Sequence, residues 1–166
     1  MTLVKPIIAI LTSNEKLRSD AIVDLEQSIG SVDFIGSAHP FIHTEYYEPE
    51  MGADLKRNII SFNLTIEAYE LANIKNKTCE IEEKFKTNGN RNINIDPGYL
   101  SLHQVVLASN KGGGHMLMIS KNVYVDFLLW YNKGWRSLPW TYPDFKDRTY
   151  FDEFEKIRKM FKAASK

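Results

Sequence analysis

The sequence predicts an α+β fold with a mainly antiparallel sheet. The candidate elements begin in the order strand, helix, strand, strand, helix, strand, which is the split βαβ order of ferredoxin-like folds. Hairpin signals dominate the second half, and an amphipathic pattern closes the chain, so we expect C-terminal hairpins and a terminal helix beyond that unit. With 166 residues, of which 43% are hydrophobic, the chain fits a single domain over residues 1–166 with one core.

The first half of the chain supplies the split βαβ order. Pro6 to Leu11 is a continuous apolar run bounded by turn residues, which predicts a central strand buried on both faces. Apolar residues recur at helical spacing from Leu17 to Ile29, and Gly30 stands where a helix commonly ends. The remaining elements predicted here are extended segments at 32–35, 41–47 and 58–64 and a helix with an apolar stripe from Ile74 to Phe85.

Short elements separated by turns make up the second half. Asp96-Pro-Gly-Tyr99 predicts a type II turn, because proline fixes φ and glycine accepts positive φ. Thr149 to Ala164 predicts the closing helix, with acids in its first turn and lysines in its last. Between them we expect a short strand at 93–96, a brief helix at 101–108, strands at 115–120 and 123–131, and a turn at 132–134 leading to a strand that ends near 138.

Composition excludes several classes of protein. The 21 basic and 21 acidic residues cancel, so general attraction to polyanions is absent and nucleic acid is an unlikely partner. No run approaches the roughly 20 apolar residues that cross a bilayer, so we expect no membrane partner. Cys79 is the only cysteine, which excludes an intramolecular disulfide, and the early apolar run is too short for a secretory signal. We therefore expect a cytoplasmic protein.

The glycine run Lys111-Gly-Gly-Gly-His115 invites comparison with a phosphate-binding loop. A P-loop follows a strand, ends in a lysine and a hydroxyl residue, and opens a helix. Here the lysine precedes the glycines, and the next residues are strand-like. The run therefore predicts a flexible connection between elements, and it leaves Lys111 and His115 as candidate functional residues.

Four further positions carry side chains that turn or strand formation alone does not require. Asp96 could orient His115 as a general acid or base, and Tyr99 could stack on or bond a ligand. Trp140 and Tyr142 lie in a proline-flanked extended segment, where large rings cover a core or line a cleft.

The acidic segment from Glu45 to Gly52 has two interpretations. Closely spaced carboxylates remain ionised when they are solvated, paired with cations or bound to a metal. A solvated rim paired with Lys56 or Arg57 is the favoured interpretation. The alternative is a metal site formed by His39, His43 and Glu45, which Pro40 makes less regular. We predict no metal here, and the sequence identifies no cofactor.

Five blocks stand in order along nearly the whole chain: Glu45-x-Tyr47-x-x-Glu50-Met-Gly52, Ile74-Lys75-x-x-Thr78-x-x-Ile81-Glu82, Asn94-x-Asp96-Pro-Gly-Tyr-Leu100, Leu107-Ala-Ser109-x-Lys111 with His115, and Pro139-Trp-Thr-Tyr-Pro-Asp144. Together they resemble a bacterial family catalogued as domain of unknown function 4416. The resemblance implies a cytosolic bacterial protein of one domain and carries no established activity. Some similar proteins bear a GTP-binding label, yet this chain has neither a P-loop nor an Asn-Lys-x-Asp guanine motif.

Our leading hypothesis is a cleft that binds a small anionic or nucleotide-like ligand, with acid–base chemistry if the protein is an enzyme. Lys75 and Lys111 would hold the anion, and Asp96 and His115 would transfer protons. The predicted ligand-binding residues are Glu50, Lys75, Tyr99, Lys111, Trp140 and Tyr142.

Two rival hypotheses come from other classes of protein. The first is a non-catalytic module for protein interaction or homo-oligomerisation that exposes Trp135, Trp140 and Tyr142. The second is RNA binding through sheet aromatics such as Tyr124 or Phe127, which the balanced charge disfavours. Neither the reaction nor the oligomeric state follows from the sequence.

Overall fold

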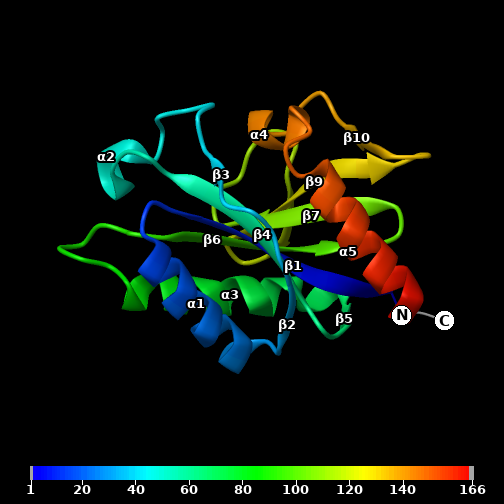
Figure 1. Cartoon of the computed structure of the whole chain (residues 1–166), viewed down its shortest axis with the longest axis horizontal. Coiled ribbons are helices and arrows are strands. Elements are labelled where there is room, and N and C mark those ends of the chain that lie inside the picture. Colours follow the sequence, from blue (N-terminus) through cyan, green and yellow to red (C-terminus); the bar gives the residue numbers. More distant parts are fainter. Residues whose placement is uncertain (1, 165–166) are drawn as a thin grey trace.

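A central strand organises the sheet in the computed structural model, which describes residues 2–164 (Figure 1). β1 (Leu3–Thr12) pairs antiparallel with β6 (Asn94–Leu100) on one side and with β4 (Lys56–Phe62) on the other. β2 (Val32–Ile35) pairs with β4, which gives the order β6-β1-β4-β2. This is the predicted split βαβ order, and the α+β class with a mainly antiparallel sheet is confirmed.

Helices cover both faces of this half of the sheet (Figure 1). α1 (Glu15–Ser28) and α3 (Leu71–Lys84) pack on the face that carries Ile8 and Ile10 of β1. α5 (Phe151–Ala164) packs on the other face, against Ile7 and Ala9. Because neighbouring residues of a strand point to opposite faces, the apolar run is buried on both sides, as predicted.

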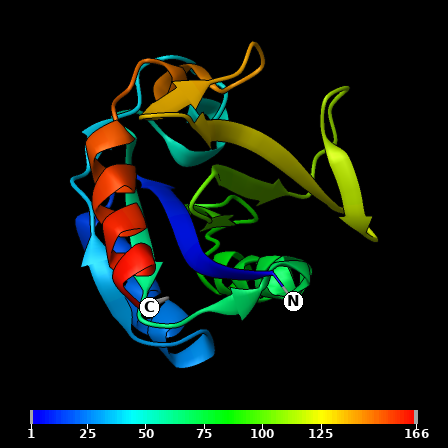
Figure 2. The ribbon, with the colours of Figure 1, turned by 90° about the vertical axis from the view of Figure 1, so that its right-hand side faces the viewer.

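Three further strands extend the sheet beyond β6. β7 (Gln104–Ser109), β9 (Val123–Tyr131) and β10 (Trp135–Ser137) follow in that order, and β8 (Leu117–Ser120) pairs with β9. Figure 2 shows the sheet curving and β8 projecting from the body beside the start of β9. The short elements are β3 (His39–Pro40), α2 (Glu48–Met51), β5 (Ile66–Glu67), the 3₁₀ helix η1 (Ala68–Glu70) and α4 (Pro143–Lys146).

The turn predicted at Asp96-Pro-Gly-Tyr99 is wrong, because these residues lie within β6. Ile95 donates its N–H to a side chain of α3, and alternate N–H groups of a strand point to the same side. Pro97 therefore turns its nitrogen away from β1 and needs no hydrogen-bond partner from that strand. Gly98 lets β7 approach, since a Cβ there would collide with the carbonyl oxygen of Val106.

Two other predictions for local structure are also wrong. The helix predicted at 101–108 is strand β7, whose apolar residues are buried on both faces. Such runs suit a strand or a buried helix equally well, so periodicity alone could not decide. The extended segment predicted at 41–47 is largely irregular and leads into α2, where Pro49 occupies the first turn of the helix.

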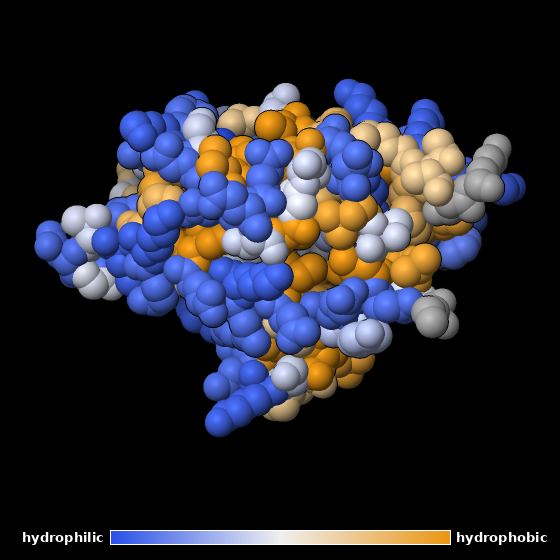
Figure 3. All heavy atoms as spheres, turned by 90° about the horizontal axis from the view of Figure 1, so that it is seen from below, coloured by the Kyte–Doolittle hydropathy of each residue, from blue (hydrophilic) through white to orange (hydrophobic). Residues whose placement is uncertain are grey.

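The helical side of the molecule is mainly hydrophilic. Seen from below, charged and polar side chains cover much of this face, and apolar side chains gather beside them (Figure 3). Within residues 2–164, no helix is long and apolar enough to cross a membrane.

Candidate functional site

The sheet opens between β6 and β7, and a pocket of about 420 Å³ lies beside this opening. β6 pairs with β7 only from Gly98 to Leu100, because Pro97 has no N–H with which to continue the ladder. The lining comes from β6, the end of β7, α3, the segment from Phe41 to Tyr47, and the start of α4. The pocket therefore joins residues that lie far apart in the sequence.

Two side chains of α3 bond the part of β6 that β7 leaves unpaired. Glu82 Oε1 accepts the N–H of Ile95 at 2.5 Å, and Lys75 Nζ donates to the carbonyl oxygen of Ile95 at 3.2 Å. Lys75 and Glu82 are seven residues apart, so they lie on the same face of the helix after two turns. The opening is thus stabilised by α3, which brings a carboxyl group and an ammonium group to the pocket.

Asp96 lies at the centre of a polar network that runs to the rim. Its carboxylate accepts from Lys75 Nζ at 3.3 Å and from Asn94 Nδ2 at 2.7 Å. Asn94 Oδ1 in turn accepts from Arg91, which holds both oxygens of Glu50 at 2.9 and 2.8 Å. The hydrogen bonds from Arg91 lower the pKa of Glu50 to about 2.

Lys111 stands at the rim without a carboxylate partner among residues 2–164. Its ammonium group donates to the hydroxyl of Tyr46 and lies 4.6 Å from the centre of that ring. No carboxylate oxygen of residues 2–164 lies within ion-pair distance of it. A cation that faces an aromatic side chain and water is available to bind an anion.

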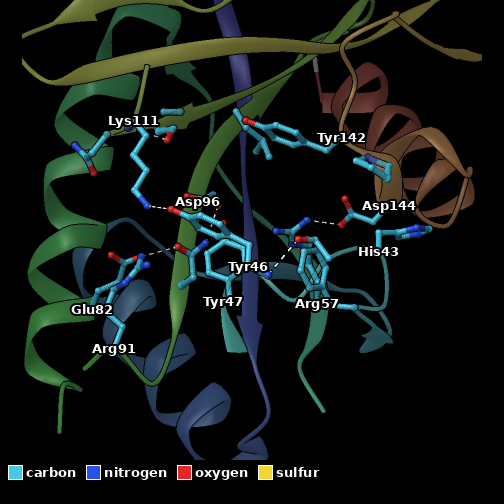
Figure 4. Close-up of a pocket in the computed structure, with 18 of the residues that line it drawn as sticks. His43, Tyr46, Tyr47, Arg57, Glu82, Arg91, Asp96, Lys111, Tyr142 and Asp144 are labelled. Atoms are coloured by element: carbon cyan, nitrogen blue, oxygen red, sulfur yellow. Dashed lines mark hydrogen bonds and ion pairs between the residues drawn. The ribbon is translucent and has the colours of Figure 1, made fainter. Parts of the chain in front are cut away.

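The opposite wall contains a buried ion pair. Arg57 donates to Asp144, and Tyr150 also donates to that carboxylate, at 3.3 Å. Burial opposes the charge on Arg57, but the charge of Asp144 and its neighbours keeps the pKa of Arg57 above its ordinary value. Each member of the pair neutralises the charge of the other. Figure 4 shows Lys111, Glu82 and Arg91 on one side of the pocket, Tyr142, Asp144 and His43 on the other, and Asp96, Tyr46 and Tyr47 between them.

Burial changes the acidity of several groups in the wall. It raises the pKa of Glu82 to about 7 and that of Tyr47 to about 12. It also raises the pKa of Tyr142, an effect that the charge of Asp126 reinforces. Burial opposes the charge of Lys75, yet Asp96 and Glu82 outweigh it and raise the pKa of that lysine. The pocket thus holds a lysine cation beside a carboxyl group that titrates near neutral pH.

Comparison of the sequence with models of protein families supports the resemblance that the sequence blocks indicate. A family model described as Domain of unknown function (DUF4416) matches residues 2–161. The chain belongs to this family. No curated protein matches it. The matched range includes every residue that lines the pocket, so the opening in the sheet lies within the DUF4416 region.

Half of the residues predicted for the site of this DUF4416 protein line the pocket: Lys75, Asp96, Lys111 and Tyr142. Glu50 reaches it indirectly, through Arg91. Tyr99 lies three residues after Asp96 on β6 and therefore points to the opposite face. There it contacts apolar residues, and its hydroxyl accepts from Gln104 at 3.0 Å.

His115 has a different carboxylate partner from the one predicted. Its Nε2 lies 3.2 Å from Oδ2 of Asp126, while Asp96 is bonded by Lys75 and Asn94. The His115 ring also stacks on Trp140, with 5.9 Å between ring centres. Neither His115 nor Trp140 is among the residues that line the pocket. Burial raises the pKa of the Asp126 carboxyl that His115 contacts.

Sequence reasoning missed Glu82, Arg91 and Asp126 as site residues. Glu82 could have been found from its spacing to Lys75, which places both on one face of a helix. Asp126 could have been found as the one carboxylate within the apolar strand from Val123 to Tyr131. Arg91 has no comparable signal, because it lies in an irregular segment and meets Glu50 only through the fold.

Proposed function

We propose that this DUF4416 protein binds a small organic anion in the pocket between β6 and β7. Lys111 carries the proposal, because it is a pocket cation with no carboxylate partner among the described residues. A cation that is already neutralised by an ion pair has less to gain from a ligand than a free one. Binding would replace the contact of Lys111 with water and with Tyr46.

The side chains that line the pocket favour a ligand that has both an anionic group and a ring. Three of the four basic side chains in the described lining are paired with carboxylates, and Lys111 is the cation that is left for a ligand. Aromatic rings supply flat apolar surface for a nucleobase or a similar group. The basic residues are Arg57, Lys75, Arg91 and Lys111, and the rings are Phe41, Tyr46, Tyr47 and Tyr142.

Calorimetric titration with inorganic phosphate, AMP and GMP tests this proposal. We expect AMP or GMP to bind more tightly than phosphate, because the rings add contacts, and Lys111→Gln to weaken binding about tenfold. The matched control is Lys121→Gln, which alters an exposed lysine in the turn after β8. No binding by any of the three anions, or equal loss in both variants, would refute the proposal.

Acid–base chemistry by Asp96 and His115 remains a prediction. Asp96 accepts hydrogen bonds from Lys75 and Asn94, and the first of these contacts positions Lys75 for the ligand. His115 does not line the pocket; it contacts Asp126, whose charge acts on Tyr142 in the lining, so these two residues would link it to the ligand. Asp96→Asn should therefore weaken AMP binding more than His115→Ala.

A second candidate function is association between copies of this chain. α3 packs on one face of the sheet but does not cover all of it. Leu117, Phe127 and Trp130 lie on the same face and are exposed. They share this face because their cross-strand partners are Val125, Val106 and Gln104. Three aromatic residues were predicted to be exposed for such an interaction. Trp135 is buried and Tyr142 lines the pocket, so only Trp140 of the three is exposed.

Sedimentation velocity at increasing protein concentration tests this second candidate. Association through the uncovered face predicts a dimer that Leu117→Lys disrupts, because a charge would then be buried at the contact. Met118→Lys is the control, since cross-strand pairing with Tyr124 places Met118 on the other face of β8. A monomer at all concentrations would exclude the association.

A further inference from the structure

Glu82 differs from the other two carboxyl groups that line the pocket. Asp96 is paired with Lys75, and Asp144 is paired with Arg57. Glu82 has no ion pair among residues 2–164, and it is 7% exposed. A buried carboxyl group without a cation is rarely kept in the ionised state.

The two oxygens of Glu82 have different surroundings. Oε1 accepts the Ile95 N–H at 2.5 Å, which fixes the side chain in the opening of the sheet. Oε2 accepts no hydrogen bond from the described residues, and it is not among the side-chain atoms sealed from solvent without a partner. Since Glu82 lines the pocket, Oε2 is the atom left open to a ligand.

We propose that Glu82 is the proton-transfer group of this pocket and that it donates a hydrogen bond from Oε2 to an oxygen of the bound anion. The inference rests on the proposed function, because it needs an anion in the pocket. In a proton transfer, the O–H bond of Glu82 breaks, a bond from that proton to the ligand oxygen forms, and Glu82 becomes a carboxylate. The reverse step restores the acid.

The charged groups around Glu82 leave it able to hold a proton. Lys75 and Cys79 face it from α3, Arg91 from the segment before β6, and Asp96 from β6 itself. Lys75 is bound by Asp96, and Arg91 is bound by Glu50, so the two nearby cations are already neutralised. Burial then outweighs their attraction and raises the pKa of Glu82 to about 7.

An incoming anion would reinforce the protonated state. A second negative charge close to a carboxylate disfavours ionisation of that carboxylate. Binding should therefore take up protons at neutral and higher pH, and affinity should fall as pH rises. Asp96 is poorly suited to this role, because each of its two carboxylate oxygens already accepts a hydrogen bond, Oδ1 from Lys75 and Oδ2 from Asn94.

The titration of Glu82 can be measured in the free protein. Carbon NMR of protein with labelled glutamate carboxyls should show one resonance with a midpoint near pH 7, and Glu82→Gln should remove it. Glu83→Gln is the matched control, because it makes the same chemical change one position along α3 on an exposed side chain. A midpoint between about 4 and 5 for Glu82, the ordinary range for glutamate, would overturn the proposal.

Calorimetric titration with AMP then tests the coupling to binding. Between pH 6 and pH 8 we expect the affinity of the parent and of Glu83→Gln to fall about tenfold more than that of Glu82→Gln, in which an amide donor replaces the acid. Comparison with Glu82→Gln removes the contribution of AMP's own ionisation. Parallel pH dependence in all three proteins would overturn the role of Glu82.

The two proposals fail in different ways. Absence of AMP and phosphate binding at every pH would refute the anion site, and the role of Glu82 would fall with it. Binding that is weakened by Lys111→Gln but has the same pH dependence in Glu82→Gln would leave the anion site intact and refute the role of Glu82 alone.

Discussion

Replacement of Glu82 by glutamine should change how the stability of this protein depends on pH. Burial raises the pKa of Glu82 from 4.5 to about 7 in the folded state. Between these two values the folded state binds more protons than the unfolded state, so the free energy of unfolding falls as pH rises. Below 4.5 the group is neutral in both states, and above 7 the loss is complete.

The size of the effect follows from the shift in pKa. About 2.5 units correspond to roughly 3 kcal/mol, since each unit is worth about 1.4 kcal/mol. Glutamine cannot ionise, and its side-chain oxygen can still accept the Ile95 N–H. We therefore expect Glu82→Gln to match the parent near pH 5 and to be more stable by up to about 3 kcal/mol near pH 8.

Guanidinium unfolding at pH 5, 6, 7 and 8 measures this difference. Other titrating groups contribute equally to both proteins, so the difference curve isolates Glu82. Glu83→Gln should run parallel to the parent, because that side chain is exposed. If Glu82→Gln also ran parallel to the parent from pH 5 to pH 8, burial would not have raised the pKa of Glu82, and the reasoning would be refuted.

Three further predictions concern the walls of the pocket and the sheet. Asp144→Asn should lower the unfolding free energy by about 3 to 5 kcal/mol, because Arg57 is left buried without its carboxylate; chemical denaturation measures this, and a loss below 1 kcal/mol would contradict it. Gly98→Ala should cost about 1 to 3 kcal/mol through collision with the Val106 carbonyl, seen as a lower melting temperature. Tyr99→Phe should cost about 1 kcal/mol through loss of its hydrogen bond with Gln104 and leave AMP binding unchanged; weaker binding would place Tyr99 in the site after all.

Local signals were sufficient for most of the main elements. The apolar run at Pro6 to Leu11 predicted β1, and Asn14 caps α1 by accepting from the N–H of Leu17. Helix periodicity predicted α3 and α5 to within a few residues. These features depend on residues close together in the sequence, so spacing and capping were enough to find them.

The sequence also identified part of the pocket, through side chains that local structure did not require. Lys75, Asp96, Lys111 and Tyr142 were predicted as site residues and line it. The prediction of a turn at Asp96-Pro-Gly was wrong because proline, which lacks an N–H, suits two structures equally well: a turn, or a strand position whose nitrogen faces no partner strand. Only the position of β7 decides between them.

The sequence by itself determined the class of fold, the central strand, the helices and a set of polar candidates. The tertiary structure alone decided that β6 is unpaired with β7 before Gly98, that His115 meets Asp126, and that Glu82 enters the opening from α3. It also decided which carboxyl group can hold a proton near neutral pH. That property depends on burial and on charges from α3, β6 and the segment around Arg91, and these segments meet only when the chain has folded.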